Sequence, residues 1–367
     1  IVMNGPKTAT ANWRTQYYLT VSSPYGTTGG EGWYYGGDFA YATLNTGIVD
    51  HGNETRRVFT QWSGDASGTN YAQSDPILMS RPKTAIANWK TQYYLTVSSP
   101  SNSPPYGSPT PASDWFDNGT EITASVTSPW PGSEGTRYVC TGWTGTGSVP
   151  SSGTGTSVTF TLSEPSSITW NWKTQYYLTV SSLCDSPTPT SDWFDDGTNI
   201  TASVTSPCPG PAGTRYACTG WNGTGSVPSS GTGTSVTFTI TEPSSITWNW
   251  KTQYQVIFDQ TGVGSDFTGT VVIIDSVDYT INDLPTTPDF WWDENSDHSF
   301  LFASPLVVNA GKQYAWQSTS GLSSLQGETL TITTSGEVVG NYIEQNRITF
   351  DQTGVGPDFT GTIIIID

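Results

Sequence analysis

The residues best suited to bind a metal ion lie in one short acidic stretch, WWDENSDHS, at residues 291–299. It contains the side chains of Asp293, Glu294, Asp297 and His298. Carboxylate oxygens are the ligands that Ca²⁺ prefers, so the stretch is a weak candidate for a calcium site. A solvated acidic loop is the more common meaning of such a run, and it is our main interpretation. We expect no other metal or cofactor.

The sequence predicts no nucleophilic or acid–base site. The two histidines, His51 and His298, lie in different parts of the chain, and no Ser/His/Asp or Cys/His set can be assembled around either one. Paired aspartates in DWFDNG and DWFDDG resemble acid–base carboxylates, but the Asn-Gly or Asp-Gly that closes each stretch predicts a tight turn. These aspartates are Asp114, Asp117, Asp192 and Asp195. We therefore expect that the chain is not an enzyme.

Four cysteines are available for disulfide chemistry. Cys184 and Cys208 occur together in one of two nearly identical segments and are both missing from the other, which predicts a disulfide between them. It would close a loop of about 25 residues and add ~2–4 kcal/mol of stability. Cys140 and Cys218 occupy matching positions and are expected to be buried thiols that fill space. Other pairings, Cys208–Cys218 among them, stay open because four cysteines allow three connectivities.

Four N-x-[ST] sequons provide possible sites of N-glycosylation. In a chain rich in Thr, Ser and Asn, some sequons arise by chance. Three of the four fall in turns or on the polar side of a predicted strand, so we expect modification at two or more. The asparagines are Asn53, Asn118, Asn199 and Asn222.

Composition limits the partners and the fold. The 367 residues carry 13 basic and 31 acidic side chains, a formal charge of −18, which disfavours nucleic acid and anionic membrane surfaces as partners. Charged residues are only 12% of the chain, whereas Gly, Pro and aromatic residues are abundant, which is typical of short strands joined by turns. No stretch has helical spacing of apolar residues, and none is apolar enough to span a membrane.

A strongly repeated segment organises the chain. NWKTQYYLTVSS occurs at 88–99 and again at 171–182, with variants at 12–23 and 249–258. These copies delimit four modules, called repeats 1 to 4 below. The predicted divisions are a closing strand at 1–14, repeats at 15–90, 91–173, 174–251 and 252–343, and opening strands at 344–367 of an incomplete or partner-completed module.

The repeated segment is predicted to be one continuous strand that joins two modules. The run TWNWKTQYYLTV at 169–180 contains no Gly and no Pro, which a hinge or flexible linker would need. Its parity places Trp172, Thr174 and Tyr176 on one face, with Lys173 on the other. A strand shared in this way stiffens the array, as in other repeat proteins. Ligand binding by the same aromatic residues is the less favoured interpretation.

Aromatic residues in repeat 1 replace polar ones of repeat 2. Five of them are predicted to form an exposed patch that serves subunit packing or, as a second choice, glycan binding. They are Trp33, Tyr34, Tyr35, Phe39 and Tyr41.

The motifs as a whole resemble a known family. The stretch WSGD…ILMSRPKTAIANWKTQYYLTV (62–97), the variants YVCTGWTGTG and YACTGWNGTG, and FDQTGVGSDFTGTVVIID (258–275) look like divergent internalin-B-type repeats of bacterial and archaeal cell-surface proteins. The resemblance covers nearly the whole chain. It implies an extracellular, all-β array with stalk, adhesion or surface-coat roles, and it offers no catalytic residues.

The ends of the sequence look like parts of further modules. An aliphatic strand at Ile363, Ile364, Ile365 and Ile366 would invite edge pairing if it were exposed. We expect either that the sequence is a window of a longer polypeptide or that other copies complete the ends by strand addition.

These observations predict an all-β, helix-poor protein. Its fold would be a tandem array of small antiparallel β-sandwich modules, Ig-like or β-grasp-like, forming an elongated rod. The leading hypothesis is a structural subunit of an extracellular filament or surface coat at the cell surface, with copies of itself as partners. The alternative is an adhesin or glycan-binding stalk that contacts glycans or other cell surfaces through exposed Trp and Tyr. A third possibility is the non-catalytic stalk of an enzyme.

Overall fold

The computed structural model describes residues 2–100, 105–184 and 186–365. The prediction of an all-β protein is confirmed: the described residues form strands β1 to β31 and one short 3₁₀ helix, η1 (Ile281–Asp283). No helix among them is long and apolar enough to cross a membrane. The chain divides into two compact units, Ile1–Tyr176 with Phe194–Asp196, and Tyr177–Trp193 with Gly197–Asp367.

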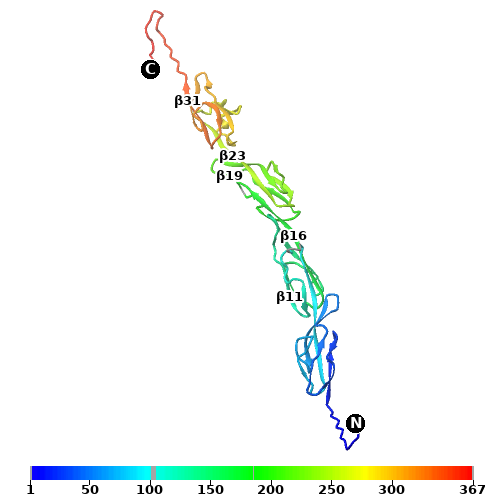
Figure 1. The fold of residues 1–367 in the computed structure, drawn as a ribbon. Helices are drawn as coiled ribbons and strands as arrows, with labels where there is room; N and C mark the ends of the chain where they lie inside the picture. Colours follow the sequence, from blue (N-terminus) through cyan, green and yellow to red (C-terminus); the bar gives the residue numbers. More distant parts are fainter. Residues whose placement is uncertain (1, 101–104, 185, 366–367) are drawn as a thin grey trace. The chain divides into compact units, whose positions relative to one another are not determined.

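Short strands joined by turns fill each repeat, and a long strand ends repeats 1, 2 and 3 (Figure 1). Repeat 1 contains β1 (Gln16–Ser22), β2 (Thr28–Gly29), β3 (Gly32–Tyr35), β4 (Phe39–Ala40), β5 (Thr43–Leu44), β6 (Ile48–Asp50), β7 (Thr55–Gly64), β8 (Ile77–Leu78) and the start of β9 (Lys83–Ser98). Repeat 2 adds β10 (Asp114–Asp117), β11 (Glu121–Ser125), β12 (Trp130–Pro131), β13 (Thr136–Thr146), β14 (Ser152–Gly153), β15 (Ser157–Thr161) and β16 (Ser166–Ser181).

Repeats 3 and 4 complete the order. Repeat 3 contains β17 (Asp192–Asp195), β18 (Asn199–Ser203), β19 (Cys208–Pro209), β20 (Thr214–Thr224), β21 (Ser230–Gly231), β22 (Ser235–Thr239) and β23 (Ser244–Thr261). Repeat 4 contains β24 (Thr270–Ile274), β25 (Val277–Thr280), η1, β26 (Phe290–Asp293), β27 (Asp297–Phe302), β28 (Leu306–Asn309), β29 (Lys312–Gly321), β30 (Gly327–Thr331) and β31 (Gly336–Asn346).

Each repeat contains strands of one large sheet, described below as the repeat's larger sheet, and at least one smaller sheet of its own. In repeat 2 the larger sheet runs β10–β9–β16–β13, with β12 and β14 paired to β13, and the smaller sheet is β11–β15. In repeat 4 it runs β26–β23–β31–β29–β28, and the smaller sheet is β25–β24–β27–β30. The smaller pairs are β2–β5 and β4–β8 in repeat 1 and β18–β22 in repeat 3.

The prediction of purely antiparallel sheets is wrong at one position in every repeat. The first and last strands of a repeat are neighbours and run parallel, for example β1 with β9 and β23 with β31. The parallel pairs are all formed by the strands through which the chain enters and leaves a repeat, and the pairing is the same in all four repeats.

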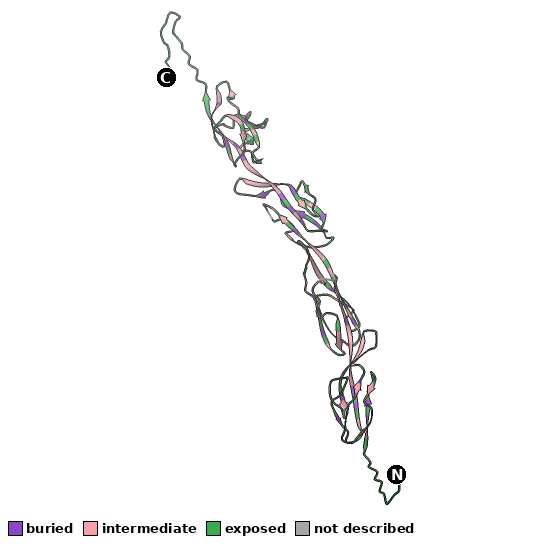
Figure 2. Ribbon diagram, viewed as in Figure 1, coloured by how far each residue is buried: buried purple, intermediate pink, exposed green. Residues whose placement is uncertain are grey.

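Each hydrophobic core lies between the two kinds of sheet. In repeat 2, Ile122 of β11 and Phe160 of β15 pack with Leu95, Ile168 and Trp170 of the larger sheet. Alternate residues of β11 are exposed, as the polar–apolar alternation predicts. The same burial pattern is visible along the strands in Figure 2. Repeats 1 and 4 have core clusters of their own.

The predicted strand at 363–366 does not form in the described residues. Residues 347–365 have no strand and are exposed, and Ile366 lies outside the described residues. Their copy in repeat 4, β24, is a strand because β25 and β27 pair with it on both edges. Without such partners an aliphatic segment has no ladder to join.

Candidate functional site at the joints between repeats

Three strands cross from one repeat into the next without a break. These are β9, β16 and β23, and none of them contains Gly or Pro, so the prediction of continuous strands through the repeated segment is confirmed. At each crossing the central residues are the repeated Lys-Thr-Gln. A long strand of the preceding repeat, β7, β13 or β20, pairs with the crossing strand there.

Four side chains form a hydrogen-bonded set at the first crossing. The guanidinium of Arg56 donates from Nε to Oε1 of Gln92 at 2.8 Å. Nε2 of Gln92 donates to Oδ1 of Asp117 at 2.8 Å, and Nζ of Lys90 pairs with Oδ2 of the same carboxylate at 2.9 Å. We call this set the joint network. It links repeat 1, the shared strand and repeat 2.

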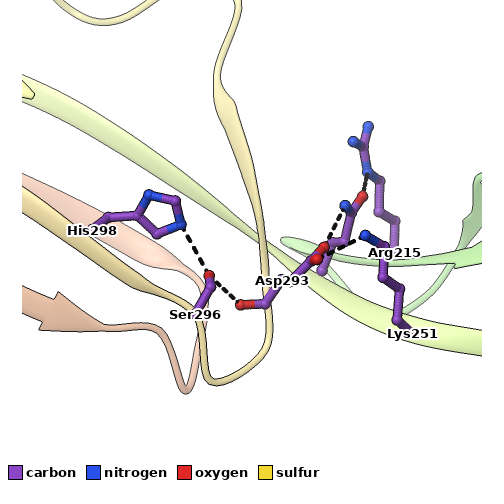
Figure 3. Close-up of polar contacts among 6 residues, drawn as sticks. Arg215, Lys251, Asp293, Ser296 and His298 are labelled. Carbon is purple, nitrogen blue, oxygen red and sulfur yellow. Dashed lines mark hydrogen bonds and ion pairs between the residues drawn. The ribbon is translucent and has the colours of Figure 1, made fainter. Parts of the chain in front are cut away.

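The joint network occurs three times with the same atoms. At the second crossing it joins Arg137, Gln175, Asp195 and Lys173, all within the first unit, with distances of 2.7 Å throughout. At the third crossing it joins Arg215, Gln253, Asp293 and Lys251, within the second unit, at 2.7, 2.8 and 2.7 Å. Figure 3 shows this third network, with Asp293 between Lys251 and the glutamine that Arg215 contacts.

Strand register explains why four residues from three strands meet. Gln92 is opposite Arg56 on one neighbouring strand and opposite Asp117 on the other. Side chains that are directly opposite in a ladder share a face and lie close together. Lys90 precedes Gln92 by two residues, so it points to that same face.

The arginine makes a second contact with the following repeat. The guanidinium carbon of Arg56 lies 4.4 Å from the ring centre of Trp115, and that of Arg215 lies 4.5 Å from the ring centre of Trp291. Such cation–π contacts contribute about 0.5–1 kcal/mol at exposed sites. Arg56 and Arg215 therefore bind the next repeat through an indole, in addition to their hydrogen bonds to the glutamine.

The chemistry of the network is positional. The lysine and aspartate side chains are about two-fifths exposed at all three crossings. Each exposed pair contributes at most about 1 kcal/mol. In all three networks each carboxylate oxygen accepts a hydrogen bond, one from the lysine and the other from the glutamine. The network fixes the register of one repeat against the next.

A tryptophan beside each crossing joins the two parallel strands of a repeat. The indole Nε1 of Trp89 donates to Ser23 Oγ at 3.0 Å. Trp172 and Trp250 make the same bond to Ser99 and Ser182, at 2.9 and 3.1 Å. In repeats 1, 2 and 3 the last strand is thereby held to the end of the first strand.

The network changes at the two outer positions. Tyr35 lies opposite Gln16, where the other crossings have an aspartate, and the guanidinium of Arg14 lies 4.1 Å from its ring centre. After repeat 4, Gln313 takes the place of the arginine and donates to Gln345 at 2.7 Å, and Ile343 stands in the lysine position. Complete networks occur only at the three internal crossings of the described chain.

The aspartates of the network have lowered pKa values. Hydrogen bonds from Gln92 and then Lys90 lower the pKa of Asp117. For Asp195 and Asp293 the first cause is the lysine, Lys173 or Lys251, followed by the glutamine. Because these carboxylates are stabilised in their charged form, the folded state binds fewer protons there than the unfolded chain does.

Acid should therefore weaken the joints. The stabilisation is complete above the ordinary aspartate pKa of about 3.9 and is lost as pH falls through the lowered folded value. We expect the midpoint temperature of unfolding to decrease when the pH is lowered below about 4. The decrease should be smaller in the triple variant D117N/D195N/D293N. Calorimetry of both proteins from neutral to acid pH measures this difference. Parallel profiles would contradict the assignment.

The acidic stretch at 291–299 does not converge on a metal site. Asp293 belongs to the third joint network, Glu294 accepts from the Tyr254 hydroxyl, and Asp297 accepts from Thr331. Among the described residues no group of three or more His, Cys, Asp and Glu side chains could hold a metal ion. The turns predicted after Asp117 and Asp195 are present, and the carboxylates of these residues also bind the joint lysines.

His298 lies in a hydrogen-bonded chain that the spacing did not predict. Its Nδ1 lies 2.7 Å from Asp275 Oδ2, and its Nε2 lies 2.9 Å from Ser296 Oγ. The order Asp–His–Ser resembles a catalytic triad, but the Ser296 hydroxyl donates to the carbonyl of Asp293 at 2.6 Å (Figure 3). Trp292 stacks on the imidazole at 3.8 Å. The hydrogen of the Ser296 hydroxyl is thus bonded to the backbone carbonyl of Asp293. The hydrogen bonds among Asp275, His298 and Ser296 position the loop beside the third joint network.

The predicted disulfide is confirmed and the other two cysteines are free. Cys184 and Cys208 are bonded, with Cα atoms 6.4 Å apart, within the usual range. Cys140 and Cys218 are free and half-buried rather than fully buried. Burial raises the pKa of the Cys140 thiol, which keeps it protonated and unreactive at neutral pH.

The predicted aromatic patch divides into two parts. Tyr34 packs against the core of repeat 1, as does Ala40. Trp33 on β3 and Phe39 on β4 are exposed, and their strands belong to different sheets around that core. Since side chains alternate along a strand, the exposed residues of the two sheets point away from each other. The exposed set is Trp33 with Tyr35 on β3, and Phe39 with Tyr41 at β4.

The remaining candidates lie at the surface. The asparagines of all four sequons, Asn53, Asn118, Asn199 and Asn222, are exposed. Ile363, Ile364 and Ile365 are exposed as well.

The arginines of the joint network were missed from the sequence. A signal for them is present: a Thr-Arg dipeptide recurs at 55–56, 136–137 and 214–215, at the start of the strand that pairs with each crossing.

Comparisons with models of protein families, with curated proteins and with solved structures found no match to this chain. The three joint networks can instead be compared with one another, because they lie at equivalent positions of the repeats. The same atoms meet in three different sequence contexts.

Proposed function

We propose that the chain is a structural subunit of an extracellular filament or surface coat. In this proposal the repeats are stiff Ig-like β-sandwich modules in an elongated rod, and the chain belongs with the internalin-B-type surface proteins that it resembles. The observation that carries the proposal is the threefold joint network on continuous strands. A binding site gains nothing from repeating an ion pair at every joint, whereas a load-bearing array does.

Two further observations support a location outside the cell. The Cys184–Cys208 disulfide fits an oxidising compartment. The four exposed sequon asparagines are accessible to glycosylation in such a compartment.

Assembly is proposed to occur by strand addition between copies. Residues 7–14, KTATANWR, copy residues 83–90, KTAIANWK, of β9. The copy in β9 is paired by β1 and β7, whereas residues 7–14 have no strand partner among the described residues, and Trp13 is 92% exposed. A segment with the sequence of a central strand and two open edges is suited to join a sheet of another copy.

Electron microscopy of the purified chain at rising concentration tests this proposal. We expect filaments or sheets from the native sequence. The variant W13D/I364D places charges in the two end segments without altering a core residue, so it should remain folded by circular dichroism and fail to assemble. Wild-type protein that stays monomeric at every concentration would contradict assembly, and so would a variant that assembles normally.

A further inference from the structure

Repeat 4 differs from the other repeats at the joint that it shares with repeat 3. Between the end of its first strand and β26 lie β24, β25 and η1, whereas the described residues of repeats 2 and 3 form only an isolated bridge in that interval. All of these residues belong to the second unit together with Arg215 of repeat 3. The insertion forms a wall beside the third joint network.

One substitution also changes the surface next to the network. In repeat 2 Tyr94 lies opposite Trp115 and their ring centres are 5.4 Å apart. Tyr177 and Trp193 form the matching pair in repeat 3, at 5.2 Å. In repeat 4 the residue opposite the equivalent tryptophan is a glutamine, Gln255.

The glutamine leaves the indole without an aromatic partner. Gln255 is opposite Trp291, and its amide donates to the carboxylate of Asp289. Among the described residues Trp291 has the guanidinium of Arg215 over its ring but no paired aromatic ring. A polar amide–carboxylate pair thus replaces the tyrosine that packs against this tryptophan elsewhere.

A pocket of about 490 Å³ lies beside these residues; Trp291 and Asp289 line it, whereas Gln255 contacts it only through Asp289. Arg215 lines it from repeat 3, and Tyr279, Asn282, Asp289 and Trp291 line it from repeat 4. Its volume lies in the range of small-ligand sites, which are about 300–1,000 Å³. The pocket combines an indole with several polar side chains.

The polar groups have capacity for a ligand. Arg215 donates from Nε to Gln253, and its terminal nitrogens make no hydrogen bond within the described residues. One oxygen of Asp289 is bound by Gln255 and the other is not. One guanidinium, that of Arg215, and two carboxylates, those of Asp283 and Asp289, line the pocket, so an anion is not favoured. The set offers donors and an acceptor beside an aromatic surface.

We propose that this pocket binds a pyranose ring of a neutral glycan. Adjacent hydroxyls of a sugar donate and accept at once, which matches the free nitrogens of Arg215 and the free oxygen of Asp289. The C–H face of the ring can pack on the face of the Trp291 indole that the Arg215 guanidinium does not cover. This activity is separate from the structural role, because it depends on features that repeat 4 does not share with repeats 2 and 3.

Saturation-transfer NMR on the full chain tests the proposal. The probes are the methyl glycosides of glucose, galactose, mannose and N-acetylglucosamine, up to about 50 mM, since a single sugar ring supports only millimolar affinity. We expect one or more to bind. The variant Q255Y restores the tyrosine found in repeats 2 and 3 and should weaken that binding by about tenfold or more, with the fold unchanged.

Matched variants distinguish binding at this pocket from nonspecific binding to other aromatic residues. W291A should abolish binding, whereas W115A removes the equivalent tryptophan of repeat 2 and should leave it intact. The proposal is overturned if no glycoside binds, if Q255Y binds as well as wild type, or if W115A reduces binding as much as W291A does. Failure of filament formation in microscopy would not affect any of these outcomes.

Discussion

Replacing Gly142 by alanine is expected to destabilise repeat 2 more than any surface change in the chain. Gly142 lies in β13 at the irregularity between Cys140 and Gly142, with φ at +127°. A Cβ at this position would overlap the carbonyl oxygen of Gly153 on β14. Backbone strain of about 1–3 kcal/mol and overpacking of about 1–3 kcal/mol give an expected loss of about 2–6 kcal/mol.

Gly155→Ala is the matched control for that change. Gly155 also has a positive φ, +110°, but no atom lies within 4 Å of an added Cβ. It should therefore cost only the backbone strain, about 1–3 kcal/mol. Hydrogen exchange read by mass spectrometry on peptides of repeat 2 measures both variants in the intact chain. Equal losses of stability in G142A and G155A would contradict the close approach of β14 to Gly142, on which the larger expected loss depends.

The sequence carries enough information to predict the crossing strands. The repeated segment lacks Gly and Pro over its whole length, and its parity is constant, so only an uninterrupted strand satisfies it. The Cys184–Cys208 disulfide could also be predicted, because one of two nearly identical segments contains both cysteines and the other contains neither. Comparison of internal copies supplied what a single segment would not have shown.

The joint network could not be predicted in the same way. Asp117 lies before an Asn-Gly pair, and local turn chemistry explains it fully without any partner. Its actual partners, Gln92 and Lys90, are known only when the register between β9 and β10 is known. Register depends on pairing across repeats, which local sequence patterns do not specify.

The sheet to which each strand belongs likewise could not be predicted from the sequence. Trp33 and Phe39 are only six residues apart, and a single exposed patch was the simplest interpretation. The turn between them moves the chain from one sheet to another, so alternation restarts on the opposite side of the core. The parallel pairing of entry and exit strands has the same origin, because it is a property of the whole repeat.

The disulfide is the second feature with a large expected effect. The double variant C184A/C208A, or reduction of the wild type, should destabilise repeat 3 by about 2–4 kcal/mol. Both cysteines are buried, so the alanines add no polar group to the core. The main loss is entropic: the unfolded chain regains the freedom of a loop in which the two cysteines are 24 positions apart.

Repeat 2 provides the internal control for this loss. Where repeat 3 has Cys208 opposite Tyr216, repeat 2 has Trp130 opposite Tyr138. Tyr106 stacks on Tyr138 at 4.1 Å, so the same corner is closed there by aromatic packing. Reduction should leave that packing unchanged.

The measurement compares hydrogen exchange in the two repeats of one molecule. Protection of β18 to β22 in repeat 3 should fall by about 30- to 700-fold, the equivalent of 2–4 kcal/mol at 1.4 kcal/mol per tenfold. Protection of β11 to β15 in repeat 2 should not change. A fall in both repeats would mean that they unfold as one cooperative unit, and the joint networks would then carry more free energy than three exposed ion pairs supply. A fall in neither would mean that the loop stays ordered without its covalent link, and the entropic account of the disulfide would be wrong.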